Sequence, residues 1–310
     1  ASALQRNPQQ RERERDMTHL FIINPAAGSR DRSGEYRQKI EAAFANHTDP
    51  YRIEISQGPG DCTKLARDAA ESGETYRIYA CGGDGTLNEV VCGVAGYDNV
   101  AITCYRGGSG NDFVKIFGDA DAFMDLERLL DCKEATFDLM RCNDDYSLNI
   151  CSVGLDARIG TDVSNYKRLP LLSGFRAYAI SAVINVIRGI GEHYVVEINS
   201  EVIDGKQTLV CVCNGRYYGG GMMATPAQDR NDAEGNLSLL VFHGSSKLHT
   251  LAVFPSIFKG THIKHKKIVS IHKGKNIHVV FDRPSTIQID GETITGVTEY
   301  TAKAKIASLV

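Results

Sequence analysis

The first half of the chain repeats one pattern four times: an apolar strand-like segment, a loop that contains glycine, and a segment with helical periodicity. Strands that alternate with helices in this way form a parallel sheet with helices on its faces. The loops that follow such strands emerge at one edge of the sheet, where open α/β folds bind ligands. The strand-like segments are 19–23, 51–55, 78–81 and 100–105. The sequence therefore predicts an α/β domain whose chemistry lies in these loops.

The pattern changes near Phe137, after which strand-like segments dominate and turn signals such as Asp204-Gly205 and Asp290-Gly291 separate several of them. Such spacing is typical of a β-sandwich. Only 175–188 and 250–258 read as helices in this half. We expect an α/β domain over 17–137 with a C-terminal segment at about 298–310, and a β-rich domain over 138–297. Residues 1–16 lack the apolar core of a signal peptide, so we expect a tag or a disordered extension.

Composition excludes several classes of protein. The 310 residues carry a net charge of −3, which gives no overall reason to bind nucleic acid. No apolar run approaches the roughly 20 residues that span a bilayer. The nine cysteines are odd in number and lie in expected strands and helices, which favours a reducing cytoplasm over a disulfide framework.

One loop combines glycines with a carboxylate: Gly82-Gly83-Asp84-Gly85-Thr86 follows an apolar strand and opens a helix. Glycines and a helix N-terminus favour a phosphate, whereas Asp84 does not, unless a divalent cation or a hydroxyl donor lies between them. That combination is typical of phosphoryl transfer. No loop continues into the Gly-Lys-Ser/Thr of a P-loop, and none completes the dinucleotide-binding fingerprint.

Three loops and several later segments together resemble the diacylglycerol kinase catalytic-domain family, which includes bacterial lipid kinases and the sphingosine and ceramide kinases. The matching first-half segments are Asn24-Pro25-Ala26-Ala27-Gly28, Gly82 to Thr86, and Gly108-Ser109-Gly110-Asn111-Asp112-Phe113. The later ones are Leu148-Asn149, Gly154-Leu155-Asp156-Ala157, Asn214 with Gly219-Gly220-Gly221, and Asp290-Gly291-Glu292. The resemblance covers the chain from Met17 onward. It implies an NAD kinase/diacylglycerol kinase-like α/β domain that binds the nucleotide and a β-sandwich-like domain that binds the lipid.

The resemblance also implies roles for individual residues. Glu292 would be the general base that takes the proton from a lipid hydroxyl, and Asp84 would lie close to the metal. The ATP site would comprise Asn24, Pro25, Ala26, Ala27, Gly28, Ser56, Gly83, Asp84, Gly85, Thr86, Leu87, Asn88, Glu89, Ser109, Gly110 and Asn111. Magnesium would be held near Asn231, Glu234 and Asn236.

This chain departs from the family pattern at several positions. Ser56 and Ser109 stand where threonine is usual, and both keep the hydroxyl group. Arg106 replaces a proline and could add a cation that faces phosphate. Glu234 stands where aspartate is common, so Asp232 is an alternative metal ligand.

A basic stretch favours contact with a membrane surface. No acidic residue occurs from Pro255 to Phe281, while six lysines alternate with four histidines there. A solvated strand face and a surface that docks on anionic lipid both fit this pattern. The apolar segment from Leu169 to Ile190 either covers the sandwich core or lines an entrance for acyl chains.

The sequence thus predicts an ATP- and Mg²⁺-dependent kinase that transfers the γ-phosphate to a lipid alcohol, with diacylglycerol as the first candidate. We expect a cytoplasmic protein, peripherally associated with membranes, that binds no nucleic acid; a homodimer stays open. An NAD kinase-like enzyme acting on a soluble substrate is one alternative. A non-catalytic regulator that binds nucleotide or lipid is another.

Overall fold

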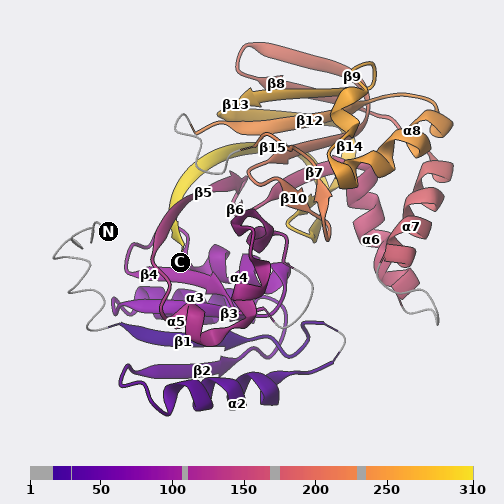
Figure 1. The fold of residues 1–310 in the computed structure, drawn as a ribbon. Coiled ribbons are helices and arrows are strands. Elements are labelled where there is room, and N and C mark those ends of the chain that lie inside the picture. Colours follow the sequence, from indigo (N-terminus) through magenta and orange to yellow (C-terminus); the bar gives the residue numbers. More distant parts are fainter. Residues whose placement is uncertain (1–16, 29, 107–110, 168–174, 229–234, 310) are drawn as a thin grey trace, which may run out of the picture. The chain divides into compact units, whose positions relative to one another are not determined.

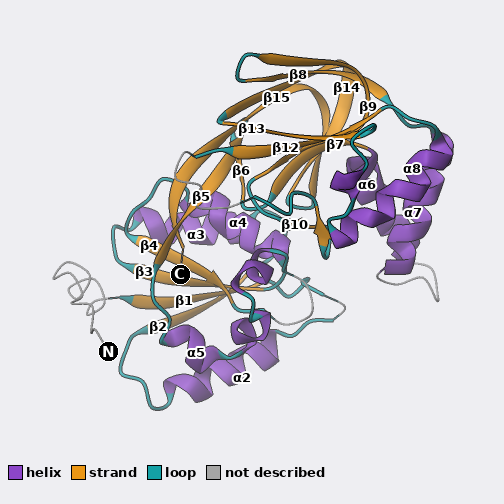
Figure 2. Cartoon of the chain, turned by 45° about the horizontal axis from the view of Figure 1, so that its top comes forward, coloured by secondary structure: helices purple, strands orange, loops and turns teal. Residues whose placement is uncertain are grey.

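Four parallel strands form the first of two large sheets in the computed structural model (Figure 1). They lie in the order β2-β1-β3-β4, with α3 and α4 on one face of the sheet and α2 and α5 on the other (Figure 2). The strands are β1 (Thr18–Ile23), β2 (Tyr51–Ile55), β3 (Tyr76–Cys81) and β4 (Val100–Cys104). The α-helices are α2 (Ser33–Phe44), α3 (Asp61–Glu71), α4 (Asp84–Val94) and α5 (Leu126–Leu130). Two 3₁₀-helices, η1 (Phe113–Phe117) and η2 (Ala120–Met124), precede α5.

Burial explains why the central strands of this sheet are apolar throughout. Every residue of β3 is buried, and so is every residue of β4, because helices cover both faces. Strand β2 is at the edge and is only half-buried, and it alternates Arg52 and Glu54 with apolar neighbours. The expected parallel sheet with helices on both faces is confirmed.

The structure describes residues 17–28, 30–106, 111–167, 175–228 and 235–309; for 163–167, 175–179 and 305–309 it describes the backbone alone. The expectation for residues 1–16 lies outside this part of the chain. Backbone contacts divide the described residues into two units, one up to Phe137 with those from Ala307 onward, and the other from Asp138 to Ile306. The sequence placed the return to the first domain at about residue 298, whereas β15 stays paired with β14 as far as Lys303.

The second unit contains a nine-stranded, mainly antiparallel sheet. Strands lie in the order β13-β12-β9-β7-β14-β15-β5-β6, and β8 pairs with both β9 and β14. The long strands β9 and β14 thus change partners along their length, so that the sheet curves around an apolar core that includes Tyr194, Val212 and Tyr300. The expected β-sandwich-like domain is confirmed.

The strands of this sheet are β5 (Ala135–Cys142), β6 (Asp145–Ser147), β7 (Ile150–Gly154), β8 (Glu192–Ile198), β9 (Glu201–Cys213), β12 (Leu237–His243), β13 (Val269–Gly274), β14 (Asn276–Ile289) and β15 (Glu292–Leu309). A separate hairpin consists of β10 (Tyr217–Tyr218) and β11 (Met222–Met223). Helices α6 (Leu155–Lys167), α7 (Phe175–Arg188) and α8 (Lys247–Val253) lie on the sheet with η3 (Phe254–Lys259) and η4 (His262–Lys264). A second apolar cluster, with Leu155, Val186 and Phe254, fills the space between them.

A buried carboxylate fixes the β14–β15 turn. Asp290 is 9% exposed, and one of its oxygens accepts hydrogen bonds from the Ser147 hydroxyl at 2.9 Å and from the backbone N–H groups of Asn149 and Ile150, both at 2.9 Å. The other oxygen accepts from the Leu148 N–H at 2.6 Å. Burial raises the pKa of Asp290, while these donors favour its ionised form and act against the rise. The turn that precedes Glu292 is therefore held against the loop between β6 and β7.

We predict that Asp290→Ala destabilises the protein by about 3–5 kcal/mol, because three buried backbone N–H groups lose the carboxylate as acceptor. Urea unfolding followed by circular dichroism measures this change, since the chain has no tryptophan. Asp282→Ala is the control: Asp282 is exposed and pairs with His193, so its loss should cost less than about 1 kcal/mol. Equal effects of the two substitutions would contradict the assignment.

A second buried carboxyl has few partners. Asp156 lies in the first turn of α6, 2% exposed, and its Oδ1 accepts from the Ala157 N–H at 2.8 Å while Oδ2 has no hydrogen-bond partner among the described residues. Burial raises its pKa to about 7. The raised pKa means that the folded protein binds this proton more tightly than the unfolded chain does. Asp156 therefore costs stability as the pH rises from its unfolded pKa near 4 to its folded pKa near 7.

We predict that Asp156→Asn stabilises the protein at about pH 8 by up to roughly 4 kcal/mol and has little effect at about pH 4, because asparagine has no charge to bury. Melting temperatures of wild type and variant across this range measure the difference. The exposed Asp145→Asn should leave the wild-type pH profile unchanged. If the difference between Asp156→Asn and wild type does not grow with pH, Asp156 is not the group responsible.

Candidate active site

We call Asn24 to Gly28 the first loop, Gly82 to Thr86 the second and Gly108 to Phe113 the third. The first and second loops are connected through Asn24. Its side-chain Nδ2 donates to the Thr86 hydroxyl at 3.1 Å, and its Oδ1 accepts from the Ala26 N–H at 3.0 Å. The Asn24 backbone N–H also donates to the carbonyl of Cys81, the last residue of β3, at 3.2 Å. A Cβ on Gly82 would lie 2.2 Å from the Thr86 hydroxyl oxygen, so a glycine is required where β3 enters α4. These contacts hold the two loops at the carboxyl edge of the sheet.

Asp84 connects the second loop to the third. Its Oδ2 accepts from the Asn111 N–H at 3.0 Å, and its Oδ1 accepts from the Asp112 N–H at 2.6 Å. Asn111 has a φ of +81°, which turns both N–H groups toward the carboxylate. Asp112 in turn receives the Lys115 ammonium. The Asp84 carboxylate, which the sequence placed beside an expected phosphate site, thus accepts hydrogen bonds from two backbone N–H groups. These bonds fix the third loop against the N-terminus of α4.

The region around these loops is suited to an anion. The first N–H groups of an α-helix have no partner within the helix and carry partial positive charge, and no side chain caps α4 at Gly83. The Asn111 side chain is 1% exposed, and neither its oxygen nor its nitrogen has a partner among the described residues. Its Oδ1 lies 3.7 Å from the position that a Cβ on Gly83 would take. Polar groups with unused hydrogen-bonding capacity therefore lie beside a helix N-terminus.

The remaining residues expected at the ATP site have mixed surroundings. Pro25 and Ala27 are half-buried, Ala26 and Gly28 are exposed, and Ser56 is buried directly after β2. Leu87 packs in the core and Asn88 is buried on α4. The Glu89 carboxylate accepts from the Cys62 N–H at 3.2 Å, so it satisfies the N-terminus of α3. Ser109 and Gly110 lie outside the described residues.

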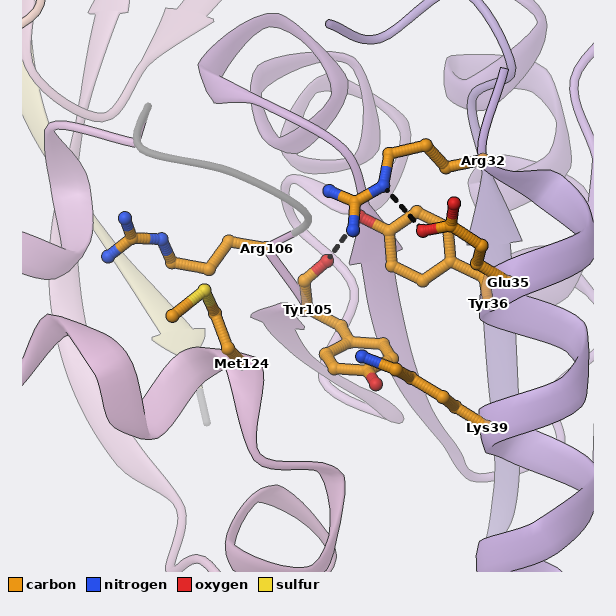
Figure 3. A pocket seen from close by; sticks show the side chains of 7 residues that line it. All are labelled: Arg32, Glu35, Tyr36, Lys39, Tyr105, Arg106 and Met124. Atoms are coloured by element: carbon orange, nitrogen blue, oxygen red, sulfur yellow. Dashed lines mark hydrogen bonds and ion pairs between the residues drawn. The ribbon is translucent and has the colours of Figure 1, made fainter. Parts of the chain in front are cut away.

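Arg106 is held by two backbone carbonyls. Its guanidinium donates to the Ala120 carbonyl at 2.9 Å, toward η2, and its backbone N–H donates to the Phe123 carbonyl at 2.9 Å. Sequence reasoning missed the cations that follow the first loop, Arg30 and Arg32, which both pair with Glu35. The signal was present as Arg-Asp-Arg just after Gly28. The pocket in Figure 3 is lined by Arg32, Glu35, Tyr36, Lys39, Tyr105, Arg106 and Met124.

The proposed magnesium ligands are only partly described. Asn231 and Glu234 lie outside the described residues, as does Asp232, and the Asn236 carbonyl accepts from the Gln228 side chain at 3.0 Å. Within the described ranges, no group of three or more His, Cys, Asp or Glu side chains could hold a metal ion. Asp84 offers hard carboxylate oxygens, but each already accepts an N–H group. Carboxylate oxygens are of the hard type that Mg²⁺ prefers, so the residue type fits the ion.

Glu292 is exposed and is the first residue of β15, opposite Ile289. It follows the turn of Asp290 and Gly291, whose φ angles are +46° and +103°. The loop that holds Asp290 is itself connected further: the Asn149 carbonyl accepts from the Asn214 N–H at 2.8 Å, and the Asn214 side chain donates to the Asp138 carbonyl at 2.7 Å. The segments of the second half that the resemblance singled out at Asn149, Asn214 and Asp290 therefore form one hydrogen-bonded network behind Glu292.

The structure locates the apolar segment and the basic stretch of the second half. Helix α7 packs on the core through Val186, and in that respect the apolar segment covers the sandwich. The lysines of the basic stretch are exposed on η3, η4, β13 and the turns beside them. Among the described residues, no helix combines the length and the apolar character needed to cross a membrane.

Comparison with known proteins agrees with the two-unit fold. The family model of the diacylglycerol kinase catalytic domain matches residues 18–142, and that of the YegS C-terminal NAD kinase beta sandwich-like domain matches residues 149–305. A predicted lipid kinase from Staphylococcus carnosus is 27% identical over 88% of this chain and 89% of its own length. Another from Staphylococcus aureus is 25% identical over 82% of this chain and 84% of its own.

Solved structures share the fold. A crystal structure of a predicted diacylglycerol kinase from Bacillus anthracis has a TM-score of 0.71 at 21% identity and covers 94% of this chain and 96% of its own. A further structure described as a diacylglycerol kinase, from the same organism, has a TM-score of 0.65 at 18% identity with the same coverage. The two family models together span nearly all of the described residues. The chain therefore belongs to the diacylglycerol kinase catalytic-domain family.

Proposed function

We propose that the protein is an ATP- and Mg²⁺-dependent kinase that transfers the γ-phosphate of ATP to the hydroxyl of a lipid alcohol, with diacylglycerol as the first candidate. One observation carries the proposal: Asn24 and Asp84 connect three loops beside a helix N-terminus that has no side-chain cap. A kinase needs such an arrangement because phosphoryl transfer depends mainly on positioning and charge neutralisation. The relatives named as lipid kinases support a lipid as the acceptor.

The nucleotide is assigned to residues 17–137. The N–H groups of the first turn of α4 would donate to phosphate oxygens, and Asn111 would supply an amide group that has no hydrogen-bond partner among the described residues. Arg30 and Arg32, which pair with Glu35, follow the first loop, and their positive charge would favour a bound polyanion. Magnesium, when bound, would neutralise charge on the β- and γ-phosphates. Asp84 would hold the third loop in place beside the nucleotide phosphates.

The lipid is assigned to residues 138–297, with Glu292 as general base. A base must be accessible to its substrate and held in one place, and Glu292 is exposed while Asp290, two residues earlier, is locked by the loop of residues 147–150. Its carboxylate would accept the proton of the lipid hydroxyl as the oxygen attacks phosphorus. The Asp290 network would thus position the base.

We predict that Glu292→Gln lowers kcat for lipid phosphorylation by about 10²–10⁴-fold with little change in KM for ATP, because the amide cannot accept a proton. Turnover of ATP with a panel of lipid alcohols measures this effect. Glu299→Gln is the matched control, since Glu299 lies on the same strand, is exposed and pairs with His278. Full activity of Glu292→Gln would overturn the assignment of the base. Formation of NADP in place of a lipid phosphate would favour an NAD kinase instead.

We predict that Asp84→Asn raises KM or Kd for ATP by roughly 10–100-fold, because two hydrogen bonds to a charged acceptor hold the third loop. Calorimetric titration with an ATP analogue measures binding without turnover. Asp68→Asn is the control, since Asp68 is exposed and pairs with Lys64 on the surface of α3. Chelation of Mg²⁺ should abolish turnover of wild type, and turnover that survives chelation would contradict the metal dependence.

We place the enzyme in the cytoplasm at the surface of membranes, where its lipid acceptor resides. The exposed lysines of the second unit support this localisation, because anionic lipids attract such residues. We propose no nucleic-acid partner, because the net charge of −3 gives no overall reason to bind one.

A further inference from the structure

Helix α7 exposes apolar side chains and buries polar ones. Val183 and Ile187, one turn apart, are 43% and 61% exposed. Ser181 and Asn185 are buried: the Ser181 hydroxyl donates to the Ile159 carbonyl at 3.2 Å, and the Asn185 side chain donates to the Asp162 carboxylate at 3.1 Å. A helix that faces water on one side has the opposite pattern. The outer face of α7 is therefore poorly suited to permanent contact with water.

Helix α8 extends this apolar face. Leu248, in its first turn, is 81% exposed, the largest exposure among the large apolar side chains that the structure describes. The neighbouring Lys247 ammonium donates to the Ile187 carbonyl at 2.5 Å, so the start of α8 lies against the end of α7. The two helices are in contact, with α8 at the end of α7 (Figures 1 and 2). We call Val183, Ile187 and Leu248 the α7–α8 patch.

The chain around the α7–α8 patch is strongly basic. From Gly235 to Phe281 there is no acidic residue, although the whole protein has a net charge of −3. Lys259, Lys264, Lys266 and Lys267 follow α8 on η3, on η4 and just beyond; all four are exposed, and none pairs with a described carboxylate. The packing of η3 on α8 and of η4 on η3 keeps this segment close to the patch.

Two acidic groups on the elements around α7 are already paired. Asp162 receives the Arg188 guanidinium and the Asn185 amide. Glu192, which follows α7, pairs with Arg158 and Arg283. The apolar side chains are thus flanked by cations whose charge is not compensated, which is the composition of a surface that lies in a lipid interface.

We propose that the α7–α8 patch inserts into the surface of an anionic lipid bilayer, with the lysines that follow α8 contacting the lipid headgroups. The inference rests on the proposed function only in that a lipid acceptor resides in a bilayer. A second copy of the chain fits the surface less well. A twofold interface through this patch would bring Lys247 and its neighbours against the same lysines of the partner.

Sedimentation with vesicles tests the proposal. Wild type should bind vesicles of phosphatidylcholine mixed with phosphatidylglycerol, and bind weakly to phosphatidylcholine alone or at high salt. Ile187→Glu with Leu248→Glu should lower binding by roughly tenfold or more, because apolar burial is replaced by charge repelled from the anionic surface. Val202→Glu is the matched control, since Val202 is 62% exposed on β9, away from these helices. Melting temperatures check that each variant is folded.

The outcomes separate this proposal from the proposed function. Unchanged binding of the folded double variant, equal loss for Val202→Glu, or no binding of wild type would overturn the role of the patch. So would a dimer in velocity sedimentation that the double variant converts to monomer while vesicle binding persists. A short-chain diacylglycerol dispersed in water isolates catalysis. The double variant should phosphorylate it as wild type does, and wild type that binds vesicles but phosphorylates no lipid alcohol would overturn the proposed function alone.

Discussion

The hydrogen bonds that Asp84 accepts from Asn111 and Asp112 hold the candidate site together. They connect the third loop to the second directly at the N-terminus of α4. Asp290 does the same work in the second unit, where it collects the N–H groups of the loop between β6 and β7. In both places one carboxylate accepts hydrogen bonds from backbone N–H groups of a loop, which have no partner in a helix or sheet. Asp290 is also buried, and a buried ionised carboxylate needs several donors.

The architecture of the first unit could be predicted almost completely from the sequence. Its strands are short apolar runs, its loops contain glycine, and its connections are local, so pattern and topology agree. The second unit was harder. Strand character could be predicted, but the partner change of β9 and β14 depends on pairings between distant segments. Helix α6 was not predicted, because Gly154 to Ala157 reads as a motif and the residues after it mix polar and apolar types without a clear stripe.

Side-chain roles at the site were predictable only as far as residue type determines them. The sequence indicated that Asp84 needs a divalent cation or a hydroxyl donor beside a phosphate, and the structure adds two backbone amides that no pattern predicted. Arg106 was expected as a cation that could face phosphate; the structure adds that its guanidinium donates to the carbonyl of Ala120, a contact that no sequence pattern reveals. Glu89 belongs by sequence to the phosphate loop, yet helical geometry turns it to the start of α3. The exposed face of α7 was equally hidden, since an apolar helix has the same composition whether its second side is covered or bare.

The contact between Gly82 and Thr86 has a consequence for how this loop can change. A side chain at position 82 would occupy the space of the Thr86 hydroxyl, which itself receives the Asn24 amide. Positions 24, 82 and 86 are thus sterically interdependent, and a change at one requires compensation at the others. In this chain the absence of a side chain at Gly82 leaves space for the Thr86 side chain. Across relatives, these three positions should vary together, independently of the nucleotide or lipid that each enzyme uses.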